Sequence, residues 1–274
     1  MKTIIVPVDF SATSANATEF AANLAAFYGA AIWLYHVYEI PVALNEFSYL
    51  AFNVAEMQEA AEHELEILKK STMEKVRIPV SINCKAEMNL LDDGLAAFCD
   101  AIKPDLVVMG LTGKNALTRL VVGSNTIRII HTLHYPVLVV PHKAEFIPIR
   151  KIGFACDYQH VIESTPVSLL KKIVRDFNAE LHVVNVDFQN TNFDSDMFNE
   201  RFILNELLHD IKVEYHNIEA EDVTEGINLF ADKAKLDWIV AIPKKHQLLQ
   251  KMFKRSHTQD LLYHTHVPVL CIHE

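Results

Sequence analysis

The sequence predicts an α/β protein made of two tandem, doubly wound, five-stranded parallel-sheet domains of the Rossmann-like kind. Three observations lead to this prediction. Short apolar runs alternate with amphipathic stretches along the 274-residue chain, the whole pattern occurs twice, and a glycine-containing segment follows one of the apolar runs. Strands that alternate with helices form parallel sheets, and ligands bind in the crevice beyond the carboxyl ends of their strands.

The first copy of the pattern alternates strand and helix throughout. Strands are expected at 4–8, 32–37, near 76–84, at 105–109 and at 137–140. Helices are expected at 12–28, 54–70, near 91–102 and from Ser124 onward. The continuous apolar runs suit parallel strands that are covered on both faces, and apolar residues at helical spacing suit helices that bury one face. Gly29 suits the position just past a helix end.

The second copy is an internal repeat of the first. Residues 2–9 align with 150–157, and residues 29–37 align with 178–186. Later in the chain, Asp105 and Pro136 recur 132 positions on as Asp237 and Pro268. Such a repeat is the signature of a duplicated structural unit. We therefore expect one domain over residues 1–142 and another over 149–274, joined by a short linker at 141–149.

Composition and charge exclude several functional classes. Half of the residues are hydrophobic and 22% are charged, as in a globular chain. The net charge of −10 argues against nucleic-acid binding, which needs a basic surface. No apolar run approaches the ~20 residues that cross a bilayer, so no membrane partner is expected. The N-terminus has no signal-peptide layout, and the four scattered cysteines form no C-x-x-C pair, so a cytoplasmic location is expected.

The glycine segment is the strongest functional feature. It reads Gly110-x2-Gly113-x9-Gly123-Ser124, between an expected strand and an expected helix. Glycines let the backbone approach an anion closely, and a helix N-terminus supplies free N–H groups for phosphate oxygens. The hydroxyl groups of Ser124 and Thr126 can add hydrogen bonds. The segment has no Gly-Lys-Ser/Thr, so it is not a Walker A loop.

This pattern, together with Asp9 after the first strand, resembles the universal stress proteins, and the duplication resembles their tandem class. In the branch of that family that binds ATP, the pattern carries the phosphates and ribose, and the ends of the first two strands hold the adenine. The resemblance implies an ATP site, optionally with Mg²⁺ held by Asp9, in the N-terminal domain. The residues that it assigns to this site are Pro7, Val8, Asp9, Val37, Met109, Gly110, Gly113, Gly123, Ser124, Asn125 and Thr126.

The resemblance also concerns assembly. The segments that begin at Pro136 and Pro268 are similar to the edge strands through which single-domain relatives dimerise. This implies that the two domains pair through these strands as an intramolecular pseudo-dimer. A higher homo-oligomer stays open, and the sequence identifies no protein partner.

The second copy has lost the glycines. Gly110, Gly113 and Gly123 are replaced by Ile242, Lys245 and Arg255. A β-branched side chain and two long ones fill the space that phosphates need, so we expect one nucleotide per chain. Basic residues between Lys244 and Arg255 could bind another anion or form a solvated face.

No catalytic constellation and no metal site are expected. Fourteen histidines invite a metal hypothesis, but no pair at helical i,i+4 spacing has a carboxylate or cysteine beside it. Cys156 could be a reactive thiol or an inert buried one. The leading interpretation is a regulatory or protective ATP-binding protein of the stress response that is not an enzyme. Two alternatives remain, a nucleotide-free interaction scaffold and a weak ATPase.

Overall fold

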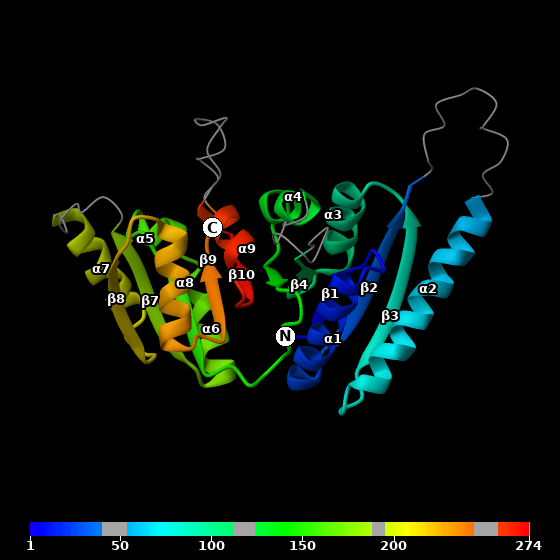
Figure 1. The fold of residues 1–274 in the computed structure, drawn as a ribbon, viewed down its shortest axis with the longest axis horizontal. Helices are drawn as coiled ribbons and strands as arrows, with labels where there is room; N and C mark the ends of the chain where they lie inside the picture. The colour runs from blue at the N-terminus through cyan, green and yellow to red at the C-terminus, as the bar shows by residue number, and fades with distance from the viewer. Residues whose placement is uncertain (40–53, 112–123, 188–194, 244–256, 274) are drawn as a thin grey trace, which may run out of the picture. The chain divides into compact units, whose positions relative to one another are not determined.

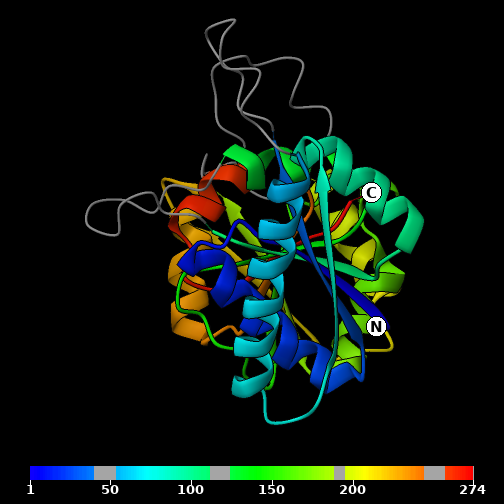
Figure 2. The same ribbon diagram turned by 90° about the vertical axis from the view of Figure 1, so that its right-hand side faces the viewer.

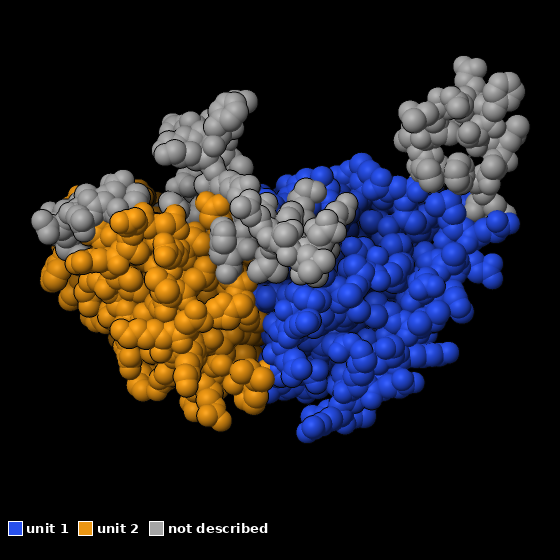
Figure 3. All heavy atoms as spheres, in the orientation of Figure 1, with its two compact units in different colours: residues 1–113, 123–146 blue, residues 114–122, 147–274 orange. Residues whose placement is uncertain are grey.

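The computed structural model describes residues 1–39, 54–111, 124–187, 195–243 and 257–273. The chain divides into two compact units, of which the first ends at Phe146 and the second begins its main segment at Ile147 (Figure 3). No helix of the described residues is long and apolar enough to cross a membrane.

Unit 1 alternates strands and helices around one parallel sheet (Figure 1). Its strands are β1 (Thr3–Pro7), β2 (Ala31–Tyr38), β3 (Ser81–Met88), β4 (Leu106–Gly110) and β5 (Val137–Val140). Its helices are α1 (Ala12–Tyr28), α2 (Val54–Lys75), α3 (Leu91–Ile102) and α4 (Ser124–Thr132). The strands lie in the order β3-β2-β1-β4-β5, and all of the pairs are parallel. This is the doubly wound arrangement that the sequence predicts.

Unit 2 repeats this order with its own strands. These are β6 (Lys151–Ala155), β7 (Glu180–Asp187), β8 (Val213–Glu219), β9 (Trp238–Ala241) and β10 (Val269–Cys271). Its helices are α5 (Val161–Ser164), α6 (Val167–Phe177), α7 (Ser195–Leu207), α8 (Val223–Ala234) and α9 (His257–His264). The parallel order is β8-β7-β6-β9-β10, so β8 is an end strand. The predicted pair of tandem α/β domains is confirmed.

Helices cover both faces of the sheet in unit 1, as the apolar strands require. On one face, the ring of Phe98 from α3 packs against Trp33 and stacks on Tyr35, with centroids 5.5 and 4.8 Å apart. On the other face, Cys84 of β3 contacts the backbone of Leu65 in α2. In Figure 2 the helix α2 runs lengthwise beside β3. The inner strands β1 and β4 are buried along most of their length.

Most of the expected elements lie where the sequence puts them, and one does not. Helix α1 has the expected limits, and its C-cap Gly29 adopts a φ of 63°. The third strand, expected near 76–84, instead begins at Ser81, because α2 continues to Lys75 and β3 pairs with β2 only from Ser81 onward. Pro79 explains the difference, since it has no N–H to donate to the ladder of a strand.

The duplication extends to individual hydrogen bonds. The carboxylate of Asp105 accepts from the backbone N–H groups of Lys2 and Thr3, which start the strand β1. In unit 2 the carboxylate of Asp237 accepts from the N–H groups at the start of β6, at 2.7 and 2.9 Å. The 132-residue repeat in the sequence therefore preserves the hydrogen bonds that hold the start of the first strand in each unit.

Candidate functional site

The candidate site in unit 1 lies at the point where the strand order reverses. The chain moves outward from β1 through β2 to β3, then returns to place β4 on the other side of β1. The carboxyl ends of β1 and β4 therefore border the crevice in which doubly wound sheets bind ligands. Asp9 follows the end of β1 by two residues, and Gly110 is the last residue of β4. Sequence and topology agree on this location.

The turn after β1 is organised around Asp9. Its Oδ1 accepts from the N–H of Ser11 at 3.1 Å and from the Ser11 hydroxyl at 2.6 Å. The backbone N–H of Asp9 is 3.4 Å from Oγ of Ser14. The next residue, Phe10, has a φ of 60°. Partial loss of water raises the pKa of the Asp9 carboxyl, but the hydrogen bonds from Ser11 and Ser14 outweigh it and leave the pKa below its usual value. Asp9 is therefore a carboxylate at neutral pH.

The N-terminus of α1 is already capped from within this turn. Ser11 is the N-cap residue, and its hydroxyl oxygen accepts from the N–H of Ser14 at 3.2 Å. The N–H of Ala15 bonds to the Ser11 carbonyl. Sequence reasoning assigned no role to Ser11 or Ser14, although a serine directly before an apolar helical stretch is a recognisable N-cap signal.

Gly110 is in close contact with α1. A Cβ at this position would lie 2.7 Å from both Cγ2 and the carbonyl oxygen of Thr13. From the other side, the Thr126 hydroxyl in the first turn of α4 is 3.4 Å from the Gly110 carbonyl oxygen. The first turns of α1 and α4 thus meet the end of β4 together. A helix N-terminus attracts anions, and the first turn of α4 brings one to this strand end.

The other predicted residues fall into three groups. The first group is buried at the ends of β1 and β4 and consists of Pro7, Val8 and Met109. The N–H of Val8 donates to the Tyr35 carbonyl of β2 at 2.8 Å. Val37 is half-buried in β2, where it pairs with Glu87, and Asn125 is exposed and accepts from Arg128. Gly113 and Gly123 lie outside the described residues, as does the side chain of Ser124, whose backbone begins α4.

A side chain holds the ends of the first two strands together in each unit. The ring nitrogen Nδ1 of His36 is 2.8 Å from the Val8 carbonyl oxygen. In unit 2 the repeat-related Asn185 donates from Nδ2 to the Cys156 carbonyl at 2.9 Å. Neither residue was singled out from the sequence, because nothing in the pattern tells which polar residue of a strand reaches the neighbouring carbonyl.

The corresponding strand end in unit 2 differs in its helix. The continuous α1 of unit 1 is replaced by the four-residue α5 and, after Pro166, by α6. The N–H of Val161, the first residue of α5, donates to Oε2 of Glu200 in α7 at 2.8 Å. A carboxylate from α7 therefore satisfies this helix end, as the hydroxyl of Ser11 does for α1 in unit 1. Ile242 stands directly after β9, where unit 1 has Gly110.

Three of the thiols are unsuited to reaction. Burial raises the pKa of Cys84 to about 11, and it raises the pKa of Cys99 and of Cys271 to about 12. These side chains are free thiols that stay protonated at neutral pH, and a thiol reacts as its thiolate. Cys84, Cys99 and Cys271 therefore offer no nucleophile for catalysis.

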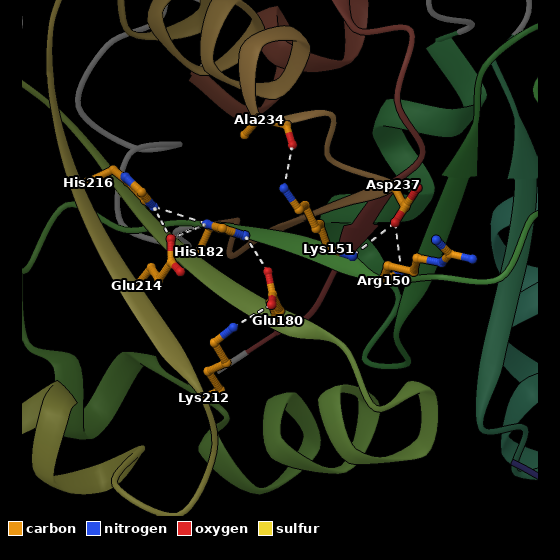
Figure 4. Close-up of polar contacts among 9 residues, drawn as sticks. All are labelled: Arg150, Lys151, Glu180, His182, Lys212, Glu214, His216, Ala234 and Asp237. Atoms are coloured by element: carbon orange, nitrogen blue, oxygen red, sulfur yellow. Dashed lines mark hydrogen bonds and ion pairs between the residues drawn. The ribbon is translucent and has the colours of Figure 1, made fainter.

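Unit 2 holds one cluster that could ligate a metal. His182 of β7 and Glu214 and His216 of β8 bring three ligand atoms within 4.8 Å of one another (Figure 4). Sequence reasoning expected no metal site, since it looked for helical spacing or cysteines. The signal that it missed is Glu-x-His, which places both side chains on the same face of a strand.

The fold, with its crevice at the strand-order reversal of unit 1, defines a tandem α/β protein of the doubly wound class. The chain belongs to the universal stress protein family, whose model matches residues 1–141 and 160–273. The universal stress protein MJ0531 of Methanocaldococcus jannaschii is 30% identical over 141 residues, which is 51% of this chain and 81% of that protein.

Solved structures show the same fold over the whole chain. A universal stress protein from Archaeoglobus fulgidus DSM 4304 matches with a TM-score of 0.75 and 16% identity, covering 99% of this chain and 98% of that one. The functionally unknown protein PA1789 from Pseudomonas aeruginosa PAO1 matches with a TM-score of 0.62 and 15% identity, covering 100% and 92%. These likenesses confirm the tandem architecture.

Proposed function

We propose that this chain binds ATP through unit 1 and acts as a regulatory or protective binding protein in the stress response, rather than as an enzyme. The observation that carries the proposal is the placement of Asp9 and Gly110 at the carboxyl ends of the neighbouring strands β1 and β4, where the strand order reverses and the first turns of α1 and α4 reach Gly110. The reduced thiols of Cys84, Cys99 and Cys271 support a cytoplasmic location.

The proposed site divides into an adenine part and a phosphate part. Pro7, Val8 and Val37 stand at the ends of β1 and β2, where their apolar side chains suit a flat base. The N-terminus of α4 faces the phosphates, because the α1 terminus is already satisfied by Ser11. Gly110, Gly113, Gly123, Ser124, Asn125 and Thr126 complete this part in the proposal.

Asp9 sets a condition on the phosphates. A carboxylate beside an anion is repulsive, and its lowered pKa keeps it charged at neutral pH. A magnesium ion between Asp9 and the phosphate oxygens removes this repulsion, since Mg²⁺ is commonly held by one or two carboxylates together with substrate phosphates. We therefore propose that the nucleotide binds as its magnesium complex.

The proposal allots one nucleotide to each chain. In unit 2 Ile242 replaces the glycine at the strand end, so a β-branched side chain stands where unit 1 has Gly110. The sequence also has Lys245 and Arg255 in place of Gly113 and Gly123. These replacements act against a second site.

The test is a titration of the purified chain with MgATP, followed by thermal unfolding and by equilibrium dialysis for stoichiometry. Ligand at about 100 times its Kd adds about 2.7 kcal/mol to the stability of the folded chain. We expect a saturable rise in the unfolding temperature with one nucleotide bound per chain. Gly123→Arg, which imports the residue of the second copy, should abolish it. Arg255→Ala, at the matching position of unit 2, should leave it unchanged.

Each other outcome points to a specific alternative. No shift at millimolar MgATP, with no nucleotide released from the purified protein, would refute the proposal and favour a nucleotide-free scaffold. Binding of two nucleotides would refute the one-site proposal. Single-turnover release of ADP and phosphate, lost in Gly123→Arg, would show a weak ATPase and contradict the assignment of a binding protein only.

A further inference from the structure

We propose that unit 2 carries a Zn²⁺ site formed by Nδ1 of His182, Nε2 of His216 and a carboxylate oxygen of Glu214. These side chains come from adjacent strands and converge on the same face of the sheet (Figure 4). The register pairs His182 of β7 with Glu214 of β8, and His216 lies two residues further along β8. Residues two apart on a strand point to the same face, so the pairing itself brings the three groups together.

The distances fit one face of a tetrahedral metal site. The atoms Nδ1 of His182 and Nε2 of His216 are 3.0 Å apart. Oε2 of Glu214 is 3.6 Å from the first of these nitrogens and 3.8 Å from the second. Ligands at about 2.0–2.2 Å from a tetrahedral zinc ion lie about 3.3–3.6 Å from one another. A shift of a few tenths of an ångström, with loss of the proton that one ring nitrogen shares with the other in their hydrogen bond, therefore brings all three atoms into coordination.

The ligand types point to zinc with an open fourth position. Two imidazoles and one carboxylate form a known zinc set, in which water or an exogenous ligand completes the coordination. The side chain of His182 is 5% exposed, whereas that of Glu214 is 49% exposed, so the cluster reaches from the protein interior to solvent at the end strand β8.

The surroundings of His182 resemble those of a metal ligand. Its second ring nitrogen, Nε2, is buried and makes no hydrogen bond among the described residues, and the Glu180 carboxylate lies 3.9 Å from it. Ligating histidines characteristically present their other ring nitrogen to a carboxylate, which fixes the orientation of the ring. Glu180 is itself held by an ion pair with Lys212. We assign Glu180 the role of a positioning residue.

The charges around the cluster are balanced. Lys212 pairs with the Glu180 carboxylate, and Nζ of Lys151 donates to the Ala234 carbonyl at 3.1 Å. The carboxylates of Glu180 and Glu214 offset the two ammonium groups, so the surroundings are close to neutral before an ion binds.

Unit 1 provides an internal comparison. His182 aligns with Trp33 in the repeat, and the strand register places Asn83 and Lys85 where unit 2 has Glu214 and His216. In both units a phenylalanine of the next helix covers this face. Phe98 packs on Trp33, and Phe230 lies 4.5 Å from the His216 ring, centroid to centroid. The scaffold is the same, but an aromatic contact in one unit has become a set of three ligands in the other.

The experiment measures Zn²⁺ binding to the full chain after removal of metals with a chelator. Isothermal titration should give one tight site per chain, and Co²⁺ in its place should give the visible bands of four-coordinate cobalt. His216→Gln and Glu214→Gln change partly exposed side chains and should leave the fold intact. Each should weaken Zn²⁺ binding by more than the about 10- to 100-fold that loss of an outer partner of a ligand costs.

The controls separate this site from incidental binding by the 14 histidines of the chain. His63→Gln changes an exposed histidine of unit 1 and should leave the tight site unchanged. Glu180→Gln should weaken Zn²⁺ binding by about 10-fold while the cobalt bands keep their shape, as expected for a residue that orients a ligand. A merely structural role would change neither measurement.

Two results would overturn the inference. One is a wild-type chain that shows no saturable Zn²⁺ binding. The other is binding whose affinity and stoichiometry are the same in wild type, His216→Gln and Glu214→Gln, which would place the ion elsewhere. If His182→Gln fails to fold because its side chain is buried, the two half-exposed ligands still decide the question. The outcome is independent of MgATP binding to unit 1.

Discussion

Gly110→Ala tests whether the last residue of β4 is a glycine for packing as well as for ligand approach. The added Cβ would lie 2.7 Å from two atoms of Thr13, namely Cγ2 and the backbone carbonyl oxygen. The side-chain atom can move, but the carbonyl oxygen belongs to the first turn of α1. Overpacking of this kind costs about 1–3 kcal/mol. Alanine also restricts the unfolded chain, which returns about 0.4–1 kcal/mol.

The net expectation is a loss of about 1–2 kcal/mol in the free energy of unfolding, measured by urea denaturation without nucleotide. At about 2–4 °C per kcal/mol, the melting temperature should fall by a few degrees. The double variant Thr13→Ala/Gly110→Ala removes only the Cγ2 clash, so it should recover part of the loss. Wild-type stability in Gly110→Ala would refute the clash. Complete recovery in the double variant would show that the backbone of α1 plays no part.

The remaining predictions concern hydrogen bonds at the strand ends. Ser11→Ala removes the oxygen that accepts from the Ser14 N–H and should cost about 0.5–2 kcal/mol in urea unfolding; an unchanged midpoint would contradict its capping role. The folded-state pKa of Asp9 lies below the usual 3.8, so its charge stabilises the fold above about pH 4 and loses this effect as the pH falls through the lowered pKa. The stability difference between wild type and Asp9→Asn should therefore shrink on acidification, and a constant difference would count against the bonds at Asp9. Asn185→Leu removes the bond to the Cys156 carbonyl and should cost about 0.5–1.5 kcal/mol, whereas Asn185→His, the residue of unit 1, should retain most of the stability.

The fold was predictable because its signals are local and repeated. The continuous apolar run Ile4–Val6 and the Asp105/Asp237 repeat fix strand type and copy number without any knowledge of the tertiary structure. The third strand was predicted several residues too early, because Val76, Ile78 and Val80 have the period-two spacing of a strand. The proline among them and the length of α2 decide otherwise.

The candidate site was predictable in position but not in detail. Asp9 and Gly110 lie at the carboxyl ends of neighbouring strands, β1 and β4, as the topology of the class implies. The contact between Gly110 and Thr13 depends on how closely α1 approaches β4, a distance that no spacing in the sequence records. The sequence interpretation of Gly110 as a phosphate-approach residue therefore left out its packing against α1.

Spacing in the sequence could show only half of the histidine cluster, the Glu214-x-His216 pair. His182 and Glu214 are 32 positions apart in the sequence, and they meet only because the register of β7 and β8 sets them opposite each other. A slip of one residue in that register would turn Glu214 and His216 to the other face. Metal sites on neighbouring strands therefore become visible only when the pairing is known.

The bond between Val161 and Glu200 bears on how the two halves of this protein diverged. In unit 1 the matching helix end is capped by Ser11 from its own turn, whereas in unit 2 the acceptor comes from a helix 39 residues further along the chain. A local cap is inherited together with its helix, but a distant one requires that two elements change together. The two units therefore keep one fold while the links between their elements differ.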